Sequence, residues 1–133
     1  MKLAPKLAPS AFKVITLPTM SDTRGNLTVM DRVLPFEVQR SFWIYGAGGH
    51  RRGGHRHHVT SQALVAIAGT VNIFMDDGLS AEVISLSSPN MCLIVEPKDW
   101  HYMDFTSGSV LMVFASHGYD KNDYIDEPYA RSC

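Results

Sequence analysis

Turn-forming residues recur roughly every 8–12 residues along this chain, and no long segment shows a convincing helical period of apolar side chains. Between the turns lie short runs rich in Val, Ile, Leu and Phe, such as residues 63–67, 71–75 and 109–115. Many short strands bury apolar side chains by packing two sheets together or by closing one sheet into a barrel. The predicted fold class is therefore all-β, a sandwich or small barrel in one domain that spans residues 1–133.

Proline and glycine mark where individual strands begin and end. Residues 12–17 are rich in β-formers and are followed by Pro18, which predicts an edge strand. Residues 63–67 and 71–75 flank Gly69, and an apolar run on each side of a short turn predicts a hairpin.

One predicted strand, over residues 36–45, carries an arginine on its apolar face. A buried unpaired charge is very costly, so Arg40 either reaches the edge of the strand or meets an anion. Trp43 and Tyr45 alternate onto the opposite face. We expect these two aromatic residues to pack against a second sheet or another subunit.

Composition and charge exclude several classes of function. The 133 residues carry a net charge of −1 and a pI of about 6.6, which is not the basic field that nucleic-acid binding needs. The first residues are interrupted by Pro5 and Pro9, and no apolar run approaches the roughly 20 residues of a membrane span. We expect a cytoplasmic protein without a structural disulfide, with Cys92 in the core and Cys133 in a frayed end.

The densest group of titratable side chains lies at residues 51–58, which contain three arginines and three histidines. In an extended strand His55 and His57 point to one face, while His58 points to the other. Imidazole can take and give a proton near neutral pH, and guanidinium groups suit an anion such as a diphosphate. The pattern favours proton chemistry on a phosphorylated substrate over a solvated basic loop.

The spacing of His55, His57, Gln62 and Gly69 resembles the first cupin motif, with Gln62 at the position of the usual Glu. In metal cupins the two histidines, the Glu and a later His are ligands, and His101 is the candidate for the last. The resemblance implies a small cupin (jelly-roll) β-barrel. Because neutral Gln is a poor substitute for a carboxylate ligand, the motif favours a site without metal.

A more specific resemblance covers about residues 22–125, namely to the dTDP-4-keto-6-deoxyglucose 3,4-ketoisomerases, cupin-fold sugar isomerases. The matching motifs are Asp22-x-Arg24-Gly25-x-Leu27, Leu34-Pro35-Phe36-Glu37-Val38 with Arg40, Arg52-Gly53-x-His55-x-His57, Gln62, Gly69, Asp77-Gly78, Pro97 with Trp100, and Tyr119-Asp120-x-x-Asp123-Tyr124-Ile125. Arg56 and His58 depart from the residues common at their positions. The resemblance implies a homodimer with exchanged strands, no metal or other cofactor, and a role in making 3-acetamido-3,6-dideoxyhexoses for surface glycans such as lipopolysaccharide, or for antibiotics.

The family reaction moves the keto group of dTDP-4-keto-6-deoxy-D-glucose from C4 to C3 by proton transfer between these carbons. By carry-over from the family motif, His57 is the expected proton shuttle, and His55 orients the sugar or relays the proton. Arg24 is expected to polarise the C4 carbonyl. His101 is expected near C4, where it would favour the galacto product.

The substrate-binding candidates are Arg52 and Arg40 for the diphosphate, together with Gln62 and Tyr45. Trp43 and Tyr45 are also candidates for a dimer interface. Two other functions stay open at this point. One is a metal-dependent cupin dioxygenase, and the other is a cupin that binds a sugar nucleotide without turning it over.

Overall fold

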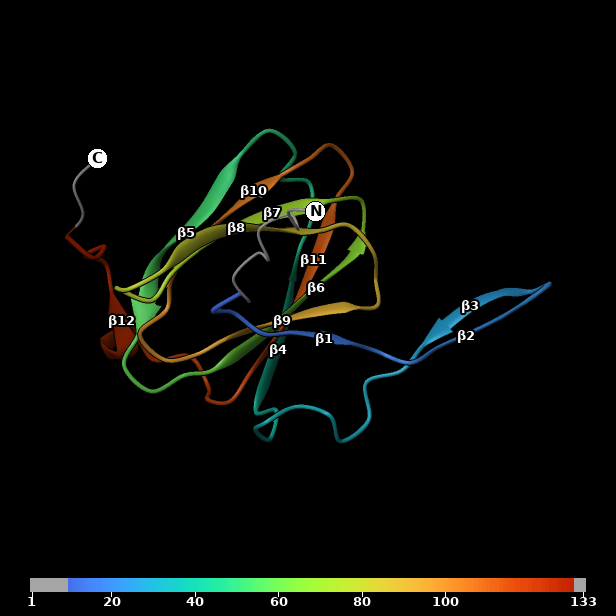
Figure 1. Cartoon of the computed structure of the whole chain (residues 1–133), viewed down its shortest axis with the longest axis horizontal. Helices are drawn as coiled ribbons and strands as arrows, with labels where there is room; N and C mark the ends of the chain where they lie inside the picture. Colours follow the sequence, from blue (N-terminus) through green and yellow to red (C-terminus); the bar gives the residue numbers. More distant parts are fainter. Residues whose placement is uncertain (1–9, 131–133) are drawn as a thin grey trace, which may run out of the picture.

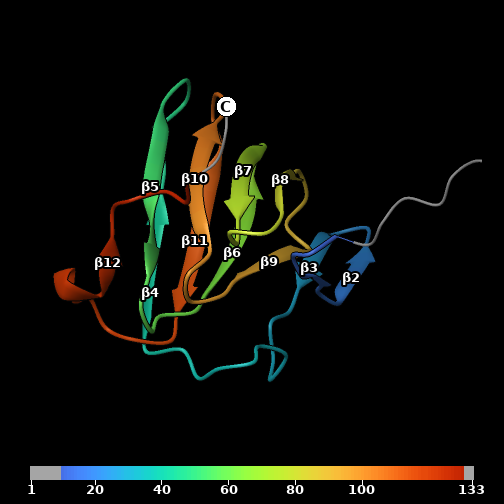
Figure 2. The same ribbon diagram turned by 60° about the vertical axis from the view of Figure 1, so that its left-hand side comes forward.

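The computed structural model describes residues 10–130, so the expectations for Pro5, Pro9 and Cys133 lie outside it. Two five-stranded antiparallel sheets face each other (Figure 1). The first has the order β1 (Val14–Thr16), β9 (Met91–Val95), β6 (Gln62–Ala68), β11 (Val110–Ala115) and β4 (Arg40–Ile44). The second has the order β12 (Tyr124–Ile125), β5 (Arg51–His57), β10 (Trp100–Phe105), β7 (Val71–Asp76) and β8 (Ala81–Leu86), and Figure 2 shows most of it side by side. The all-β prediction is confirmed.

Side chains that point inward from the two sheets fill the space between them. In β10 and β11 every second side chain is buried, as expected for strands with one face against a core. Strands β6 and β9 are buried on both faces, because the segment between β3 (Gly25–Thr28) and β4 packs on their outer side. Cys92 lies in that outer cluster as a buried free cysteine. None of the described segments is a helix with the length and apolarity that a membrane span requires.

The predicted hairpin around Gly69 is wrong. Strand β6 pairs with β9 and β11, whereas β7 pairs with β8 and β10, so the chain crosses from one sheet to the other at this turn. Gly69 has a φ of 66°, and a Cβ there would lie 2.9 Å from the Cα of Ser109. The glycine between the two apolar runs marks a crossing from one sheet to the other and not a hairpin. Both kinds of connection use a residue with a positive φ, so the glycine alone does not distinguish them.

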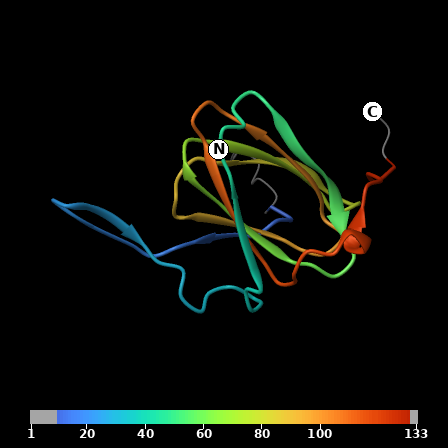
Figure 3. The ribbon, with the colours of Figure 1, turned by 180° about the vertical axis from the view of Figure 1, so that it is seen from behind.

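The predicted edge strand over residues 12–17 is confirmed as β1, which pairs only with β9. The strand predicted over residues 36–45 is shorter, and only Arg40–Ile44 pairs with β11. Strands β2 (Thr19–Asp22) and β3 form a separate hairpin that projects away from the two sheets (Figure 1). Seen from behind in Figure 3, this hairpin and β12 again lie at opposite ends of the molecule.

A β-bulge in β5 sets the register on which the site depends. His101 pairs with His55, but the next residue, Tyr102, pairs with Gly53, so Gly54 is the extra residue. Gly53 and Gly54 have φ values of 87° and 84°, a region that favours glycine. The bulge thus brings His55 directly opposite His101.

Replacing Gly53 by Ala should destabilise the protein more than replacing Gly54 by Ala. Both changes place a side chain at positive φ, which costs about 1–2 kcal/mol. Only at Gly53 would the Cβ also crowd neighbours, with Met103 Sδ at 3.0 Å and the His101 carbonyl oxygen at 3.1 Å. Urea unfolding should therefore show Gly53→Ala to be less stable than Gly54→Ala by at least about 1 kcal/mol. Equal losses would mean that the bulge tolerates a methyl group and that only the backbone conformation matters.

Candidate functional site

Three histidines and one tyrosine from three adjacent strands form a cluster. The ring of His55 lies 5.1 Å from that of His57 and 5.0 Å from that of His101, measured between centroids. Tyr124 of β12 lies 4.7 Å from both His55 and His57. Tyr124 reaches the cluster because β12 pairs with the end of β5, with Tyr124 opposite His57. The structure thus brings together the three histidines that the sequence singled out.

A cavity of about 310 Å³ opens beside this cluster between the two sheets, which is at the lower end of the range for small-molecule sites. Five of the predicted site residues line it, namely Arg40, Arg52, His55, Gln62 and His101. Apolar side chains of the barrel interior and Tyr124 complete the wall. The cavity therefore has the chemistry expected for a sugar ring beside a charged group.

His57 lies at the inner end of the cluster. Its ring is only 2 % exposed and lines a much smaller pocket, which shares Arg40, Gln62 and Tyr124 with the main cavity. The Nδ1 atom of His57 is buried and has no hydrogen-bond partner among the described residues. Any contact of His57 with a molecule in the cavity would therefore use Nε2.

Burial keeps all three imidazoles neutral. Desolvation lowers the pKa of His57 to about 4, with a smaller contribution from His55, although the carboxylate of Asp123 opposes the shift. Desolvation also lowers the pKa of His101 to about 3 and lowers the pKa of His55. At neutral pH these rings are therefore bases or hydrogen-bonding groups rather than cations.

The tautomer of His101 is set by a backbone contact. Its Nδ1 lies 3.0 Å from the carbonyl oxygen of Asp99, which can only accept, so Nδ1 carries the proton. Nε2 of His101 is then left as an acceptor. A neutral ring held in this way can orient a hydroxyl group or a water molecule beside the cavity.

Two guanidinium groups at the cavity form no ion pair with a described carboxylate. Arg40 lies over the ring of Phe42, with its Cζ 4.5 Å from the centroid, and Arg52 is exposed at the cavity. Arg51, by contrast, forms a two-pronged hydrogen-bonded pair with Asp104. Positive charge without a carboxylate partner therefore gathers at one cavity, which suits an anionic ligand.

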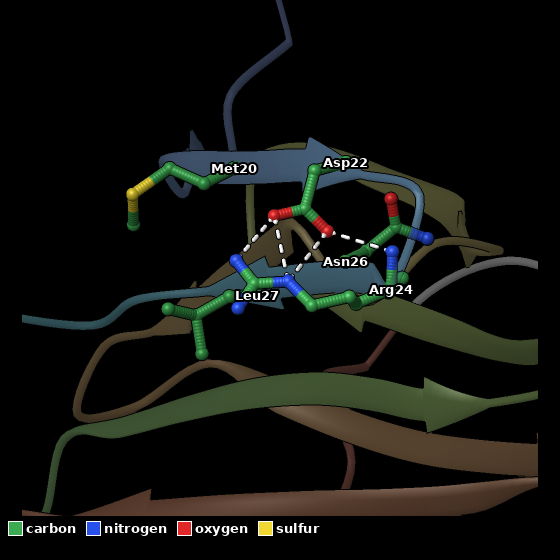
Figure 4. Close-up of a pocket in the computed structure, with 6 residues that line it drawn as sticks. Met20, Asp22, Arg24, Asn26 and Leu27 are labelled. Carbon is green, nitrogen blue, oxygen red and sulfur yellow. Dashed lines mark hydrogen bonds and ion pairs between the residues drawn. The ribbon is translucent and has the colours of Figure 1, made fainter.

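Arg24 and Tyr45 lie apart from this cavity. Arg24 is in the turn between β2 and β3, where its guanidinium is 2.6 Å from Asp22 (Figure 4). The hairpin lines a hollow of about 450 Å³, larger than the histidine cavity, but its only charged groups form this exposed pair. Tyr45 is 70 % exposed and does not line the histidine cavity. Within one chain, the β2–β3 hairpin, which carries Arg24, and strand β12, which carries Tyr124 of the histidine cluster, lie toward opposite ends (Figure 3).

Reasoning from the residues alone missed the part that the C-terminal segment plays in the site. Residues 117–125 are mostly polar, and no periodic run of apolar side chains among them predicts a strand or a helix. They nevertheless form a 3₁₀ turn, Lys121–Asp123, and strand β12, which add Tyr124 and Asp123 to the histidine cluster. The motif Tyr119-Asp120-x-x-Asp123-Tyr124-Ile125 was the available signal. Within residues 10–130, no group of three or more His, Cys, Asp or Glu side chains is arranged to hold a metal ion.

Acidification should destabilise this fold before its ordinary carboxylates are protonated. The pKa values of His57 and His101 lie below the 6.5 of a free histidine, so between about pH 6.5 and pH 4 the unfolded chain binds more protons. Burial also raises the pKa of Asp99 to about 6, and this shift favours the folded state on acidification. The two histidines outweigh it, because the pKa of each lies further from its ordinary value. We expect the free energy of unfolding to fall by roughly 2–5 kcal/mol from pH 7 to pH 4.

Thermal unfolding followed by circular dichroism at several pH values measures this loss. His101→Gln should reduce the pH dependence, whereas His58→Gln, at an exposed position, should leave it unchanged. A melting temperature that stays constant or rises on acidification would show that the buried histidines are not held neutral.

Comparison with known proteins agrees with the geometry. A family model described as WxcM-like, C-terminal (FdtA) matches residues 10–131. The chain is 39% identical over 117 residues to TDP-4-oxo-6-deoxy-alpha-D-glucose-3,4-oxoisomerase from Aneurinibacillus thermoaerophilus, which covers 85% of this chain and 84% of that relative.

Solved structures give the same family. A histidine-to-asparagine mutant of the 3,4-ketoisomerase QdtA from Thermoanaerobacterium thermosaccharolyticum, in complex with TDP-4-keto-6-deoxyglucose, superposes with a TM-score of 0.84 at 31% identity, over 90% of each chain. The TDP-quinovose 3,4-ketoisomerase WlaRB from Campylobacter jejuni also gives a TM-score of 0.84 at 31% identity, over 90% of this chain and 95% of that one. The resemblance indicated by the sequence motifs is confirmed, and the chain belongs to the WxcM-like, C-terminal (FdtA) family of sugar 3,4-ketoisomerases.

Proposed function

We propose that this protein converts dTDP-4-keto-6-deoxy-D-glucose to a dTDP-3-keto-6-deoxyhexose. The observation that carries the proposal is the cavity where neutral histidines and two guanidinium groups without carboxylate partners meet. The names of the relatives, one a TDP-4-oxo-6-deoxyglucose 3,4-oxoisomerase, supply the substrate class. The proposed location is the cytoplasm, where the nucleotides that carry such sugars are present.

The proposed reaction is a proton shift that balances within the sugar. A base removes the C3 proton, and the C4 carbonyl oxygen takes the negative charge to give an enediol or enediolate. A proton then reaches C4, while the C3 hydroxyl loses its proton and becomes the new ketone. The C4 oxygen gains a proton and becomes a hydroxyl group, so the sugar neither gains nor loses protons overall.

We assign the base to His57 and a supporting role to His55. A base that is neutral at pH 7 can accept the C3 proton, and the lowered pKa of His57 keeps it in this form. His55 lines the cavity itself and is in ring contact with His57, so it can orient the sugar or relay the proton. A QdtA mutant with asparagine in place of a histidine has been crystallised with TDP-4-keto-6-deoxyglucose, which supports a histidine role in turnover more than in binding.

The diphosphate is assigned to Arg52 and Arg40. A planar guanidinium group can bind two phosphate oxygens at once, and both groups lie at the cavity without a carboxylate partner. Gln62 is buried on the cavity wall and can hydrogen-bond the sugar. The destination of the product in a surface glycan such as lipopolysaccharide stays a prediction from the family resemblance.

His57→Asn should lower kcat by at least about 100-fold and leave the affinity for TDP within about twofold, because Asn keeps polarity but cannot exchange a proton near pH 7. Conversion is followed by NMR and TDP binding by calorimetry. His58→Asn is the matched control, since it makes the same change at the next, exposed residue and should leave kcat unchanged.

Retention of more than a tenth of wild-type kcat in His57→Asn would reject His57 as the obligatory base. If His55→Asn is then the variant that loses turnover, the two roles are reversed. A wild-type protein that binds the substrate without converting it would instead support the sugar-nucleotide-binding alternative. Loss of wild-type turnover in chelator, restored by added metal, would favour the metal-dependent one.

The stereochemical part of the proposal is a galacto product. It rests on His101, which lines the cavity and keeps an acceptor at Nε2. Because its pKa is about 3, His101 is a poor acid, and we assign the C4 proton to a water molecule oriented by this nitrogen. The water recovers a proton when the C3 hydroxyl ionises, and protonated His57 gives its proton to the C4 oxygen, which leaves a neutral ring and a C4 hydroxyl group. Delivery from the face at which His57 removes the C3 proton would set the galacto configuration, because the C3 and C4 hydrogens lie on the same face of a galacto sugar and on opposite faces of a gluco sugar.

His101→Asn should lower the share of galacto product or the rate of conversion. The 3-keto product is trapped by a PLP-dependent aminotransferase that accepts 3-keto sugars, and its C4 configuration is read by NMR. A wild-type gluco product would contradict the proposal, and so would a His101→Asn variant with unchanged rate and product.

The proposed assembly is a homodimer. The candidate for the exchanged strand is the N-terminal one over residues 12–17, which forms β1 at the edge of its sheet and leads into the projecting β2–β3 hairpin. Met20 and Leu27 of this hairpin are more than half exposed. A two-stranded hairpin is marginally stable alone and favours a partner that covers it. If Arg24 acts on the sugar, as the resemblance implies, it does so in the site of a second copy.

Light scattering at micromolar concentration should give about twice the 14.8 kDa chain mass. A mixing experiment then tests for a shared site. Arg24→Ala and His57→Asn chains should each be inactive, and mixed dimers should regain activity because one of their two sites has both residues. A 14.8 kDa particle would contradict the dimer, and no regain in verified mixed dimers would contradict the role of Arg24 across the interface.

A further inference from the structure

The small pocket behind His57 is the feature of the site that the proposed reaction does not yet use. Its volume is about 10 Å³, close to the least that can hold one water molecule. His57, Thr60, Gln62 and Asp123 contribute polar atoms to its wall. A small polar pocket of this kind is where an ordered water is expected, because such a water needs two to four polar partners.

The buried Nδ1 of His57 needs a hydrogen-bond partner. It has none among the described residues, although the ring is only 2 % exposed. If Nε2 is to take a proton from the substrate, then Nδ1 must carry the ring proton and requires an acceptor. The protein groups near His57 do not supply that acceptor directly.

Two carboxylates line this pocket, those of Asp120 and Asp123, and Asp123 is the buried one. Its carboxylate accepts hydrogen bonds from the backbone N–H of Val59, at 2.8 Å, and from the hydroxyl of Thr60. Burial acts to raise the pKa of Asp123, but these hydrogen bonds outweigh it and the pKa lies below its usual value. The carboxylate is therefore charged and fixed in place, and it keeps lone pairs that can accept from a water molecule.

We propose that one ordered water in this pocket accepts the Nδ1–H of His57 and donates to the carboxylate of Asp123, so that Asp123 is a positioning residue for the catalytic imidazole. The inference rests on the proposed role of His57 as the base. The water fixes the tautomer in which Nε2 is free. When Nε2 takes the C3 proton of the substrate, the charge of Asp123 stabilises the imidazolium that forms.

The groups around His57 decide the size of this effect. Arg40 of β4 and His55 of β5 act against a positive charge on His57, while His101 of β10 and Tyr124 of β12 contact its ring. Asp123 is the charged group that acts in favour of the protonated ring. Removing its charge should therefore make His57 a weaker base.

Asp123 also has a structural role, because its side chain and backbone attach the 3₁₀ turn to residues 58–60. Asp123→Asn separates the two roles. The amide oxygen can still accept from Val59, and the amide N–H can donate to the hydroxyl of Thr60, so the attachment remains while the charge is lost. Asp31→Asn is the control, since it makes the same change at an exposed residue between β3 and β4 that lines neither the small pocket nor the main cavity.

Long-range ¹H–¹⁵N NMR of the imidazole rings, in the full chain without substrate, reads the tautomer and pKa of His57. We expect Nδ1 to be protonated and Nε2 unprotonated in the wild type. Asp123→Asn should lower the pKa of His57 and move the acid limb of the kcat profile to lower pH. It should reduce kcat by about 10–100-fold with KM within twofold, whereas Asp31→Asn should change none of these.

A wild-type His57 that carries its proton on Nε2 would overturn the proposal, and so would an Asp123→Asn variant with unchanged His57 pKa and kcat. If Asp123→Asn does not fold, the tautomer of the wild type decides alone. Because the NMR measurement needs no turnover, its outcome is separate from that of the proposed isomerase activity.

Discussion

The site depends on the removal of two imidazoles, those of His57 and His101, from water between the two sheets. Desolvation penalises the charged form of each ring and lowers its pKa well below neutrality. A ring that stays neutral can accept a proton from a carbon acid, whereas a ring that is already charged has no free nitrogen to accept one and can only donate hydrogen bonds. Burying these polar rings costs free energy, and the packing of the surrounding core must offset this cost.

Backbone register creates this environment. The extra residue at Gly54 aligns His55 with His101, and the pairing of β12 with the end of β5 closes the cluster with Tyr124. The 3₁₀ turn before β12 adds the carboxylate of Asp123 on the inner side. The main cavity therefore has neutral bases on one wall and guanidinium groups near them, so a sugar ring and its diphosphate can each meet the group that suits it.

The sequence predicted the all-β class, the edge strand near the N-terminus and the gathering of three histidines, because alternation, proline positions and the His-x-His spacing are local signals. The hairpin at Gly69 could not be distinguished from a crossing between sheets, since a glycine at positive φ serves both. The part played by Asp123 was hidden in a polar tail, because pairing between β12 and β5 joins residues distant in the chain. Arg24 lies on the projecting β2–β3 hairpin. The direction in which this hairpin projects depends on tertiary structure, so local residue patterns could not predict where Arg24 lies.

The most direct test of the account is ¹H NMR of dTDP-4-keto-6-deoxy-D-glucose incubated with the wild-type protein in deuterated buffer. If a neutral histidine removes the C3 proton and a proton from water reaches C4, the C3 signal should disappear as a 3-keto sugar with deuterium at C4 accumulates. An unchanged nucleotide sugar that keeps its C3 proton, at protein concentrations that bind it, would contradict the account.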